Sequence, residues 1–278
     1  MKIRFLGTAA AEGFPALFCN CKYCKEARRL KGKNIRTRSQ SLINDDLLID
    51  IPADTLSHFL TGDIRGDRIK YLLITHSHSD HFYPTNLSLR GSCYAHELEE
   101  PSLRILASRE VYNACVDLKG RVSRSVADGL IIQRAEPFVE VELGEYRITP
   151  LPARHAGNEE AVIYLIRQGE KVLLYAHDTG YFYDEVFEYI EKNGIHLDLA
   201  SFDCTNAHLP SDEKGSHMGF DNVERVIERL RSIGAVDSGT RLFVNHFSHN
   251  GNPLHEDMVK SASKIGCEVS FDGCLAEF

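Results

Sequence analysis

The sequence predicts an α/β protein built as a β-sandwich flanked by helices, with residues 1–278 forming one domain. Short apolar runs typical of strands alternate with segments of helical apolar spacing, and no linker rich in Pro, Gly or Ser separates them. Hydrophobic residues make up 43% of the chain, which provides ample material for a core. Several strand-like runs are closely followed by His or Asp, residue types that bind metals. We therefore expect these residues to collect at one edge of the sandwich.

The N-terminal part of the chain is predicted to form strands and short helices. We expect strands at residues 2–6, 41–44, 47–51 and 71–74, and the turn Asn44-Asp45-Asp46 joins the second and third of these as a hairpin. Helices are expected at residues 24–30, ended by Gly32, and at residues 54–60.

The C-terminal part continues this alternation. Strands are expected at residues 148–151, 161–167, 171–175 and 242–244, with Gln168-Gly169-Glu170 as a second hairpin turn. Residues 184–192, 221–233 and 255–265 carry helical spacing, and Asp184 and Asp221 stand where they can cap the first two helices. Residues 91–137 show the least regular pattern, and their role is open.

The run from Thr75 to His81 carries the strongest chemical signal, because it places four good metal ligands in six residues after an apolar strand. In an extended or turning backbone, side chains two residues apart project to one side, so His76 and His78 can share one ion. His81 then turns toward a second ion, and Asp80 is available beside it. The order H-x-H-x-D-H favours a two-metal site over a polar loop that binds metal loosely.

Three later residues are candidate partners for this run. His155, Asp178 and His246 each come just after an apolar run that reads as a strand. Taken singly, each is more typical of a surface or hydrogen-bonded residue than of a metal ligand. Their shared position at strand ends, and their order along the chain, favour the metal-binding interpretation.

With these residues the chain resembles the metallo-β-lactamase-fold hydrolases, in which H-x-H-x-D-H is followed by a lone His, a lone Asp and a last His. The resemblance implies a four-layered αββα sandwich with a binuclear catalytic site. It assigns one ion to His76, His78 and His155 and the other to Asp80, His81 and His246, with Asp178 as the bridge. Manganese and zinc both suit these ligands, and iron is a further option, since imidazole and carboxylate accept several metals.

The N-terminal run Cys19-Asn20-Cys21-Lys22-Tyr23-Cys24 indicates a structural zinc site. The chain begins with a short β-type run and not with a secretory signal, so we expect reduced thiols and not a disulfide framework. Zinc needs a fourth ligand. Cys204, Cys267 and Cys274 are candidates, and so is His249, three residues after His246.

The C-x-C-x-x-C loop together with the H-x-x-H pair resembles the PhnP phosphodiesterases, which hydrolyse cyclic phosphates and carry a zinc site beside the catalytic one. This resemblance implies a phosphodiesterase that acts on a small or cyclic phosphodiester through a hydroxide held by two metal ions. It also suggests His217, in a glycine-flanked loop, as the proton donor to the leaving group, with His208 as a rival. A histidine pKa near 6.5 suits acid catalysis.

Asp50 follows a strand-like run and resembles the family's carboxylate that orients a metal-bound imidazole or the ligand loop. In the family a glycine usually follows shortly after this Asp. Here Ile51-Pro52-Ala53-Asp54 stands in its place, so the local loop must differ.

Composition favours a cytoplasmic enzyme with a small-molecule substrate. The formal charge of −8 offers no general attraction for nucleic-acid phosphates, so a nucleic-acid partner is not expected. No apolar run approaches membrane-spanning length, so no membrane association is expected either. Scattered arginines in residues 91–137 are more typical of a solvated face than of substrate contacts: Arg104, Arg109, Arg121, Arg124 and Arg134. A homodimer is left open.

Other functions are compatible with the same fold, because the fold alone does not determine a substrate. A relative of the PqqB proteins of pyrroloquinoline-quinone biosynthesis would carry a similar Cys loop. An RNA-processing nuclease would need a basic arm, which the chain lacks. A non-catalytic binding or scaffold protein would be missing metal ligands, and none is missing from the sequence.

Overall fold

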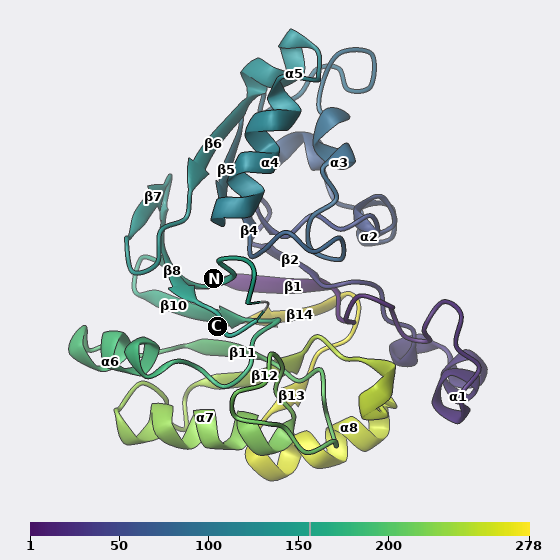
Figure 1. The fold of residues 1–278 in the computed structure, drawn as a ribbon, viewed down its shortest axis with the longest axis vertical. Coiled ribbons are helices and arrows are strands. Elements are labelled where there is room, and N and C mark those ends of the chain that lie inside the picture. The colour runs from purple at the N-terminus through teal and green to yellow at the C-terminus, as the bar shows by residue number, and fades with distance from the viewer. Residues whose placement is uncertain (156) are drawn as a thin grey trace.

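The computed structural model, which describes residues 1–155 and 157–278, contains two mixed β-sheets packed face to face. Helices cover the outer face of each sheet, so the molecule has the four layers expected from the sequence (Figure 1). The predicted α/β class and the αββα sandwich are therefore confirmed.

The first sheet has the strand order β14-β1-β2-β3-β4-β5-β6. Its strands β14, β1, β2 and β3 pair antiparallel, and β3, β4, β5 and β6 pair parallel. The strand bounds are β1 Lys2–Gly7, β2 Gln40–Ile43, β3 Leu47–Ile49, β4 Tyr71–Ile74, β5 Leu103–Ala107, β6 Leu130–Arg134 and β14 Cys274–Glu277.

The second sheet has the order β13-β12-β11-β10-β9-β8-β7 and repeats this plan. Antiparallel pairing joins β7 through β10, and parallel pairing joins β10 through β13. The bounds are β7 Val141–Leu143, β8 Tyr146–Pro152, β9 Val162–Gln168, β10 Lys171–Ala176, β11 Leu199–Asp203, β12 Arg241–Asn245 and β13 Glu268–Val269.

Helices form the two outer layers, with α2 to α5 beside the first sheet and α6 to α8 beside the second (Figure 1). The α-helices are α1 Lys22–Leu30, α2 Thr55–Gly62, α3 Thr85–Ser88, α4 Arg109–Lys119, α5 Arg124–Gly129, α6 Asp184–Lys192, α7 Phe220–Ser232 and α8 His255–Ala262. Short 3₁₀ turns occupy Gly32–Asn34, Gly66–Arg68, His249–Gly251 and Ser263–Ile265. Helix α1 lies at the periphery (Figure 1).

Strand periodicity sorts the apolar side chains into separate layers of core. Along β10, Leu173 and Tyr175 face the first sheet, whereas Leu174 and Ala176 face the helices. Successive side chains of a strand point to opposite faces, so a strand that is covered on both faces must be apolar throughout. This explains why β10 reads as a continuous apolar run.

Two expectations from the sequence are wrong. Asp184 and Asp221 do not cap α6 and α7, because each carboxylate lies inside the first turn; the cap positions are Tyr183 and Gly219, and neither makes a side-chain cap bond. Residues 91–137 are also more regular than expected, since they contain β5, α4, α5 and β6. Helix α4 buries only Val111 and Cys115, a stripe too narrow to recognise from spacing.

Within the described residues, no helix is both long and apolar enough to span a membrane.

The layer between the sheets should dominate stability. Leu173 is fully buried there, so Leu173→Ala should lower the free energy of unfolding by about 2–5 kcal/mol. Urea unfolding followed by circular dichroism measures this change. Leu275→Ala is the matched control, since Leu275 is 47% exposed and its truncation should cost far less. Equal losses from the two variants would contradict the assigned core.

Candidate metal centre

The candidate site lies where strands of both sheets end. Asp50 follows β3 and the run from Thr75 to His81 follows β4, while Asp178 and His246 follow β10 and β12 of the second sheet. Parallel strands that neighbour one another place their carboxyl ends at the same edge. Residues that are far apart in the sequence are therefore brought together at one edge of the sandwich.

One cluster of donor atoms contains His76, His78, His155 and Asp178. One ligand atom from each lies within 4.8 Å of the others. His76 Nε2 is 3.1 Å from Asp178 Oδ2, and His155 Nδ1 is 3.2 Å from Asp178 Oδ1. His78 Nδ1 lies 3.0 Å from His155 Nε2. These are the residues that the sequence grouped around one ion.

A second cluster contains Asp80, His81, His246 and again Asp178, and all four residues are buried. His81 Nε2 lies 3.1 Å from His246 Nε2, 3.4 Å from Asp80 Oδ2 and 3.2 Å from Asp178 Oδ2. The two clusters share Asp178: its Oδ2 lies near His76 of the first cluster and His81 of the second, and its Oδ1 lies near His155 of the first. This is the residue to which the family resemblance assigns the bridging position.

The donor atoms fit a pair of divalent ions. Although these atoms approach one another closely, His76 Nε2, His155 Nδ1 and Asp178 Oδ1 are buried and meet no partner in hydrogen-bonding geometry among the described residues. Burying such atoms unpaired is costly, so atoms that converge in this way suit a cation placed between them. Although burial opposes ionisation of Asp178, the surrounding imidazoles hold its pKa well below the usual range, so the carboxylate is ionised as a ligand requires.

Asp50 supports the ligand loop from behind. Its Oδ2 lies 2.7 Å from His81 Nδ1, which directs Nε2 of that ring toward the second cluster. Its Oδ1 accepts the backbone N–H of Thr75 at 2.9 Å. In the segment that departs from the family pattern, Ile51 donates its backbone N–H to the carbonyl of His81 at 2.7 Å, and its own carbonyl accepts from Tyr83. These backbone bonds connect the Asp50 segment to the ligand loop.

His217 reaches the same site from the loop before α7. Its Nδ1 lies 3.1 Å from Asp178 Oδ1 and 3.3 Å from Asp203 Oδ2. Burial opposes protonation of the ring, but the two carboxylates outweigh it and raise the pKa of His217 to about 11. The loop can approach because Gly180 has no side chain, since a Cβ there would stand 1.9 Å from the carbonyl oxygen of Gly215.

Asp203, at the end of β11, is a site residue that sequence reasoning missed. It is fully buried and accepts hydrogen bonds from the backbone of Met218 and from the backbone and hydroxyl of Thr205. Its Oδ2 also lies 3.4 Å from His246 Nδ1. The run 199–202, apolar except for Ser201, was its signal in the sequence, because it is another strand followed by a possible ligand.

Glu159 was missed as well. Its carboxylate accepts the backbone N–H of Ser77 at 2.9 Å and lies 3.3 Å from His78 Nε2, so it can fix the orientation of that ring. The neighbouring Glu160 pairs instead with Arg109 and Arg134, and Arg124 pairs with Asp128. These three arginines make exposed ion pairs, as the solvated-face interpretation expects.

His208 does not join the site. Its ring packs on Phe220 at a centroid distance of 5.2 Å, and none of the donor clusters among the described residues includes it.

The Cys loop forms its own cluster. Cys19, Cys21, Cys24 and His249 bring their ligand atoms within 4.8 Å of one another, with His249 Nδ1 at 4.0 Å from Cys21 Sγ and 3.8 Å from Cys24 Sγ. His249 lowers the pKa of the Cys21 thiol to about 6, whereas burial raises that of Cys24 to about 12. The set fits a zinc loop, with His249 and not Cys204, Cys267 or Cys274 in the fourth position.

Two mixed sheets between helices, with His- and Asp-rich strand ends at one edge, define the metallo-β-lactamase fold. A family model described as the beta-lactamase superfamily domain matches residues 48–247, and the chain belongs to this family.

The individual proteins that the chain resembles share a third of its residues or fewer. The chain is 25% identical to coenzyme PQQ synthesis protein B of Acinetobacter baylyi, with both chains covered completely. It is 32% identical to an octanoyltransferase of Porphyromonas gingivalis over 94% of this chain, but it spans only 48% of that protein.

Solved structures support the fold. A diphosphatase of the PhnP family superposes with a TM-score of 0.73 at 20% identity, covering 100% of this chain and 97% of that one. A zinc-bound PqqB of Methylobacterium extorquens gives a TM-score of 0.73 at 19% identity, with both chains covered completely.

Proposed function

We propose that the protein is a binuclear metal-dependent hydrolase that cleaves a small or cyclic phosphodiester. The observation that carries this proposal is the pair of donor clusters that share the Asp178 carboxylate. His76, His78 and His155 would hold one ion, and Asp80, His81 and His246 the other. When bound, a pair of divalent ions would supply a water-derived nucleophile near neutral pH and stabilise negative charge on the phosphoryl oxygens.

The protein's own residues orient the ligands before any ion binds. Asp50 holds the His81 ring through Nδ1, and the Thr205 hydroxyl, which is itself bonded to Asp203, lies 2.8 Å from Nδ1 of His246, so each Nε2 faces the centre. Glu159 supports the His78 ring from the other side. Such outer contacts fix both the tautomer and the direction of a ligand ring.

His217 is proposed as the proton donor to the leaving group. Its Nδ1 faces two carboxylates, which leaves Nε2 as the ring nitrogen able to give a proton away. An acid catalyst must carry its proton when the substrate binds, and Asp203, which is outside the two proposed ligand sets, favours the imidazolium form. Asp203 acts through His217 and is therefore a positioning residue.

A single structural zinc is proposed at Cys19, Cys21, Cys24 and His249. Three thiolates and one imidazole form a closed tetrahedral set without an open position, which is typical of structural and not catalytic zinc.

A PqqB-like biosynthetic role is the second candidate, because the chain aligns over its whole length with a PqqB of Acinetobacter baylyi. The two proposals differ in what they expect of simple substrates. A phosphodiesterase should turn over bis-p-nitrophenyl phosphate or 2′,3′-cyclic nucleotides with its metals bound, whereas a PqqB-like protein has no reason to do so.

Removal of one side of the metal pair tests the mechanism. Asp80→Ala should empty one of the two neighbouring metal positions and abolish phosphodiesterase activity while leaving the fold intact. Elemental analysis and turnover of bis-p-nitrophenyl phosphate measure the two effects. Asp45→Ala is the control, since Asp45 is an exposed acid whose side chain pairs with Lys2. Full activity with a single catalytic ion would refute the two-metal mechanism.

Substrates with different leaving groups test the role of His217 as the acid catalyst. A p-nitrophenolate departs with little protonation, whereas an alkyl or ribose alkoxide needs a proton in the transition state. His217→Ala should therefore cost roughly 10²-fold or more on a 2′,3′-cyclic nucleotide and clearly less on the nitrophenyl ester, at unchanged metal content. His208→Ala is the matched control and should change neither rate. Equal losses on both substrates would show that His217 binds phosphate and does not donate a proton.

The Cys loop is expected to stabilise the fold. Cys21→Ser should release one tightly bound zinc and lower the melting temperature, because metal binding at a closed site is coupled to folding. Zinc content and thermal unfolding are measured under reducing conditions, and Cys93→Ser serves as the control, since Cys93 is exposed and outside the cluster. Wild-type protein without zinc at these thiols would overturn the assignment.

A further inference from the structure

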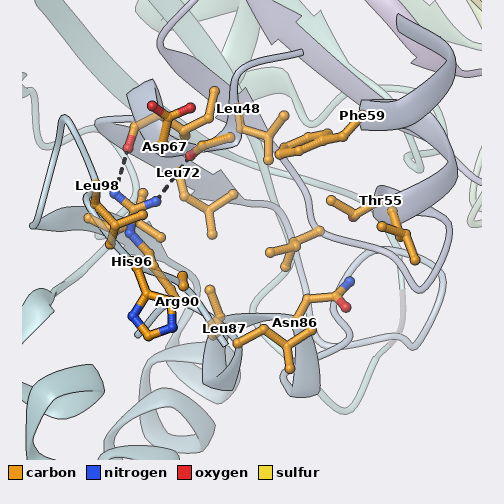
Figure 2. A pocket seen from close by; sticks show the side chains of 17 residues that line it. Leu48, Thr55, Phe59, Asp67, Leu72, Asn86, Leu87, Arg90, His96 and Leu98 are labelled. Atoms are coloured by element: carbon orange, nitrogen blue, oxygen red, sulfur yellow. Dashed lines mark hydrogen bonds between the residues drawn. The ribbon is translucent and has the colours of Figure 1, made fainter. Parts of the chain in front are cut away.

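An apolar pocket lies on the outer face of the first sheet, between α2 and the segment that begins with α3 (Figure 2). We call it the α2–α3 pocket. Its volume is about 360 Å³, within the range of small-molecule sites in proteins. Leu48, Leu72 and Leu103 of the sheet form part of its lining, and Phe59 of α2 and Leu87 of α3 form other parts.

The mouth of the pocket is also apolar. Leu56 on α2 is 69% exposed, and Leu89 after α3 is 43% exposed, although both line the pocket. Exposed leucines that surround an apolar cavity are characteristic of a surface that is covered by a ligand or a partner. The pocket therefore offers burial to an apolar group that enters past Leu56.

One end of the pocket is cationic. Figure 2 shows Arg90 and His96 on the side of the cavity away from Thr55 and Asn86. Arg90 donates to three backbone carbonyl oxygens, those of Gly66, Ile69 and Glu100, at 3.2, 3.0 and 2.5 Å. Among the described residues, no carboxylate lies within 4 Å of its guanidinium. The one carboxylate in the lining, Asp67, is engaged by Arg65 at 2.8 Å.

The residues that line the α2–α3 pocket favour ligand binding over catalysis there. The site contains neither a thiol nor any residue of the donor clusters described above. It does adjoin them through Ile51, which lines the pocket and donates its N–H to the carbonyl of His81. An occupant would therefore contact the back of the segment that holds the ligand loop.

We propose that the α2–α3 pocket binds a free medium-chain carboxylate, with its alkyl chain against the sheet leucines and its carboxylate beside Arg90. A water molecule occupies about 30 Å³ of liquid, so the pocket has room for about a dozen groups of that size, which corresponds to a chain of about eight to ten carbons. The charge of Arg90 supplies the complementarity, since its hydrogen-bond partners are neutral backbone carbonyls and it has no carboxylate partner in the described part of the chain.

Isothermal titration calorimetry on the full-length protein tests this assignment with a series of alkanoates kept below their aggregation limits. Each added methylene should tighten binding by about fourfold. The gain should stop once the chain fills the pocket, at about ten carbons. Decanoate should bind at least about tenfold tighter than decanol and decyltrimethylammonium, because the ion pair with a partly buried Arg90 is worth more than an exposed one.

Paired variants locate the site. Leu56→Glu places a like charge at the mouth and should weaken decanoate binding by at least about tenfold. Leu60→Glu is the matched control on the same helix, because Leu60 is 75% exposed and does not line the pocket, and it should bind as the wild type does. Both changes are at exposed positions, and circular dichroism checks that the variants fold.

Three outcomes would overturn the proposal. The first is the absence of saturable decanoate binding. The second is equal loss, or no loss, in Leu56→Glu and Leu60→Glu. The third is decanol binding as tightly as decanoate, which would remove the role assigned to Arg90. A gain that continues well past ten carbons would also contradict a pocket of this size and indicate adsorption to the surface.

Discussion

The arrangement of the site depends on one buried carboxylate, that of Asp178. Its two oxygens lie within 3.2 Å of ring nitrogens from His76, His81, His155 and His217, so every other candidate residue is placed relative to it. A lone carboxylate is costly to bury unless cations or donors surround it. The helices, sheets and loops of the molecule hold the imidazoles around this carboxylate. Its position is well supported because β10, the strand before it, lies at the centre of its sheet with neighbours on both sides.

Backbone conformation at the strand ends shows where this frame is under constraint. Asp50, Asp178 and His246 each have a φ between 55° and 63°, in the left-handed region that residues other than glycine rarely occupy. Such conformations cost on the order of 1–3 kcal/mol each and persist only where the surrounding structure enforces them. All three follow directly or closely on a strand and point a ligand or supporting group into the site. Their strain is consistent with a site in which geometry is maintained at the expense of local stability.

The family resemblance, which short patterns carry, implied the fold and the grouping of the ligands into two sets. H-x-H-x-D-H is contiguous, and His155, Asp178 and His246 each end a recognisable apolar run. Asp203 and Glu159 escaped because their roles depend on contacts across the fold: Asp203 touches His217 from a strand that was not recognised, and Glu159 lies in a loop with no pattern of its own. The prediction that Asp184 and Asp221 cap their helices was wrong because it rested on a local rule alone. Such a rule cannot place the first residue of a helix to within one position. The α2–α3 pocket has no sequence signature, because a cavity depends on how separate elements pack.

Substrate choice in this family must come from groups outside the metal ligands, because the same donor set suits several hydrolytic reactions. His217 is the group proposed for this role here. It is held by Asp203 and enters the site only because Gly180 lets its loop pass close to Asp178. Around the site the exposed arginines are already paired with acids, so they provide little net positive field for a long polyanion. This supports the proposed compact substrate, with a single phosphate group at the metal edge and its leaving group near His217, over a nucleic acid that would need contacts along an extended basic surface.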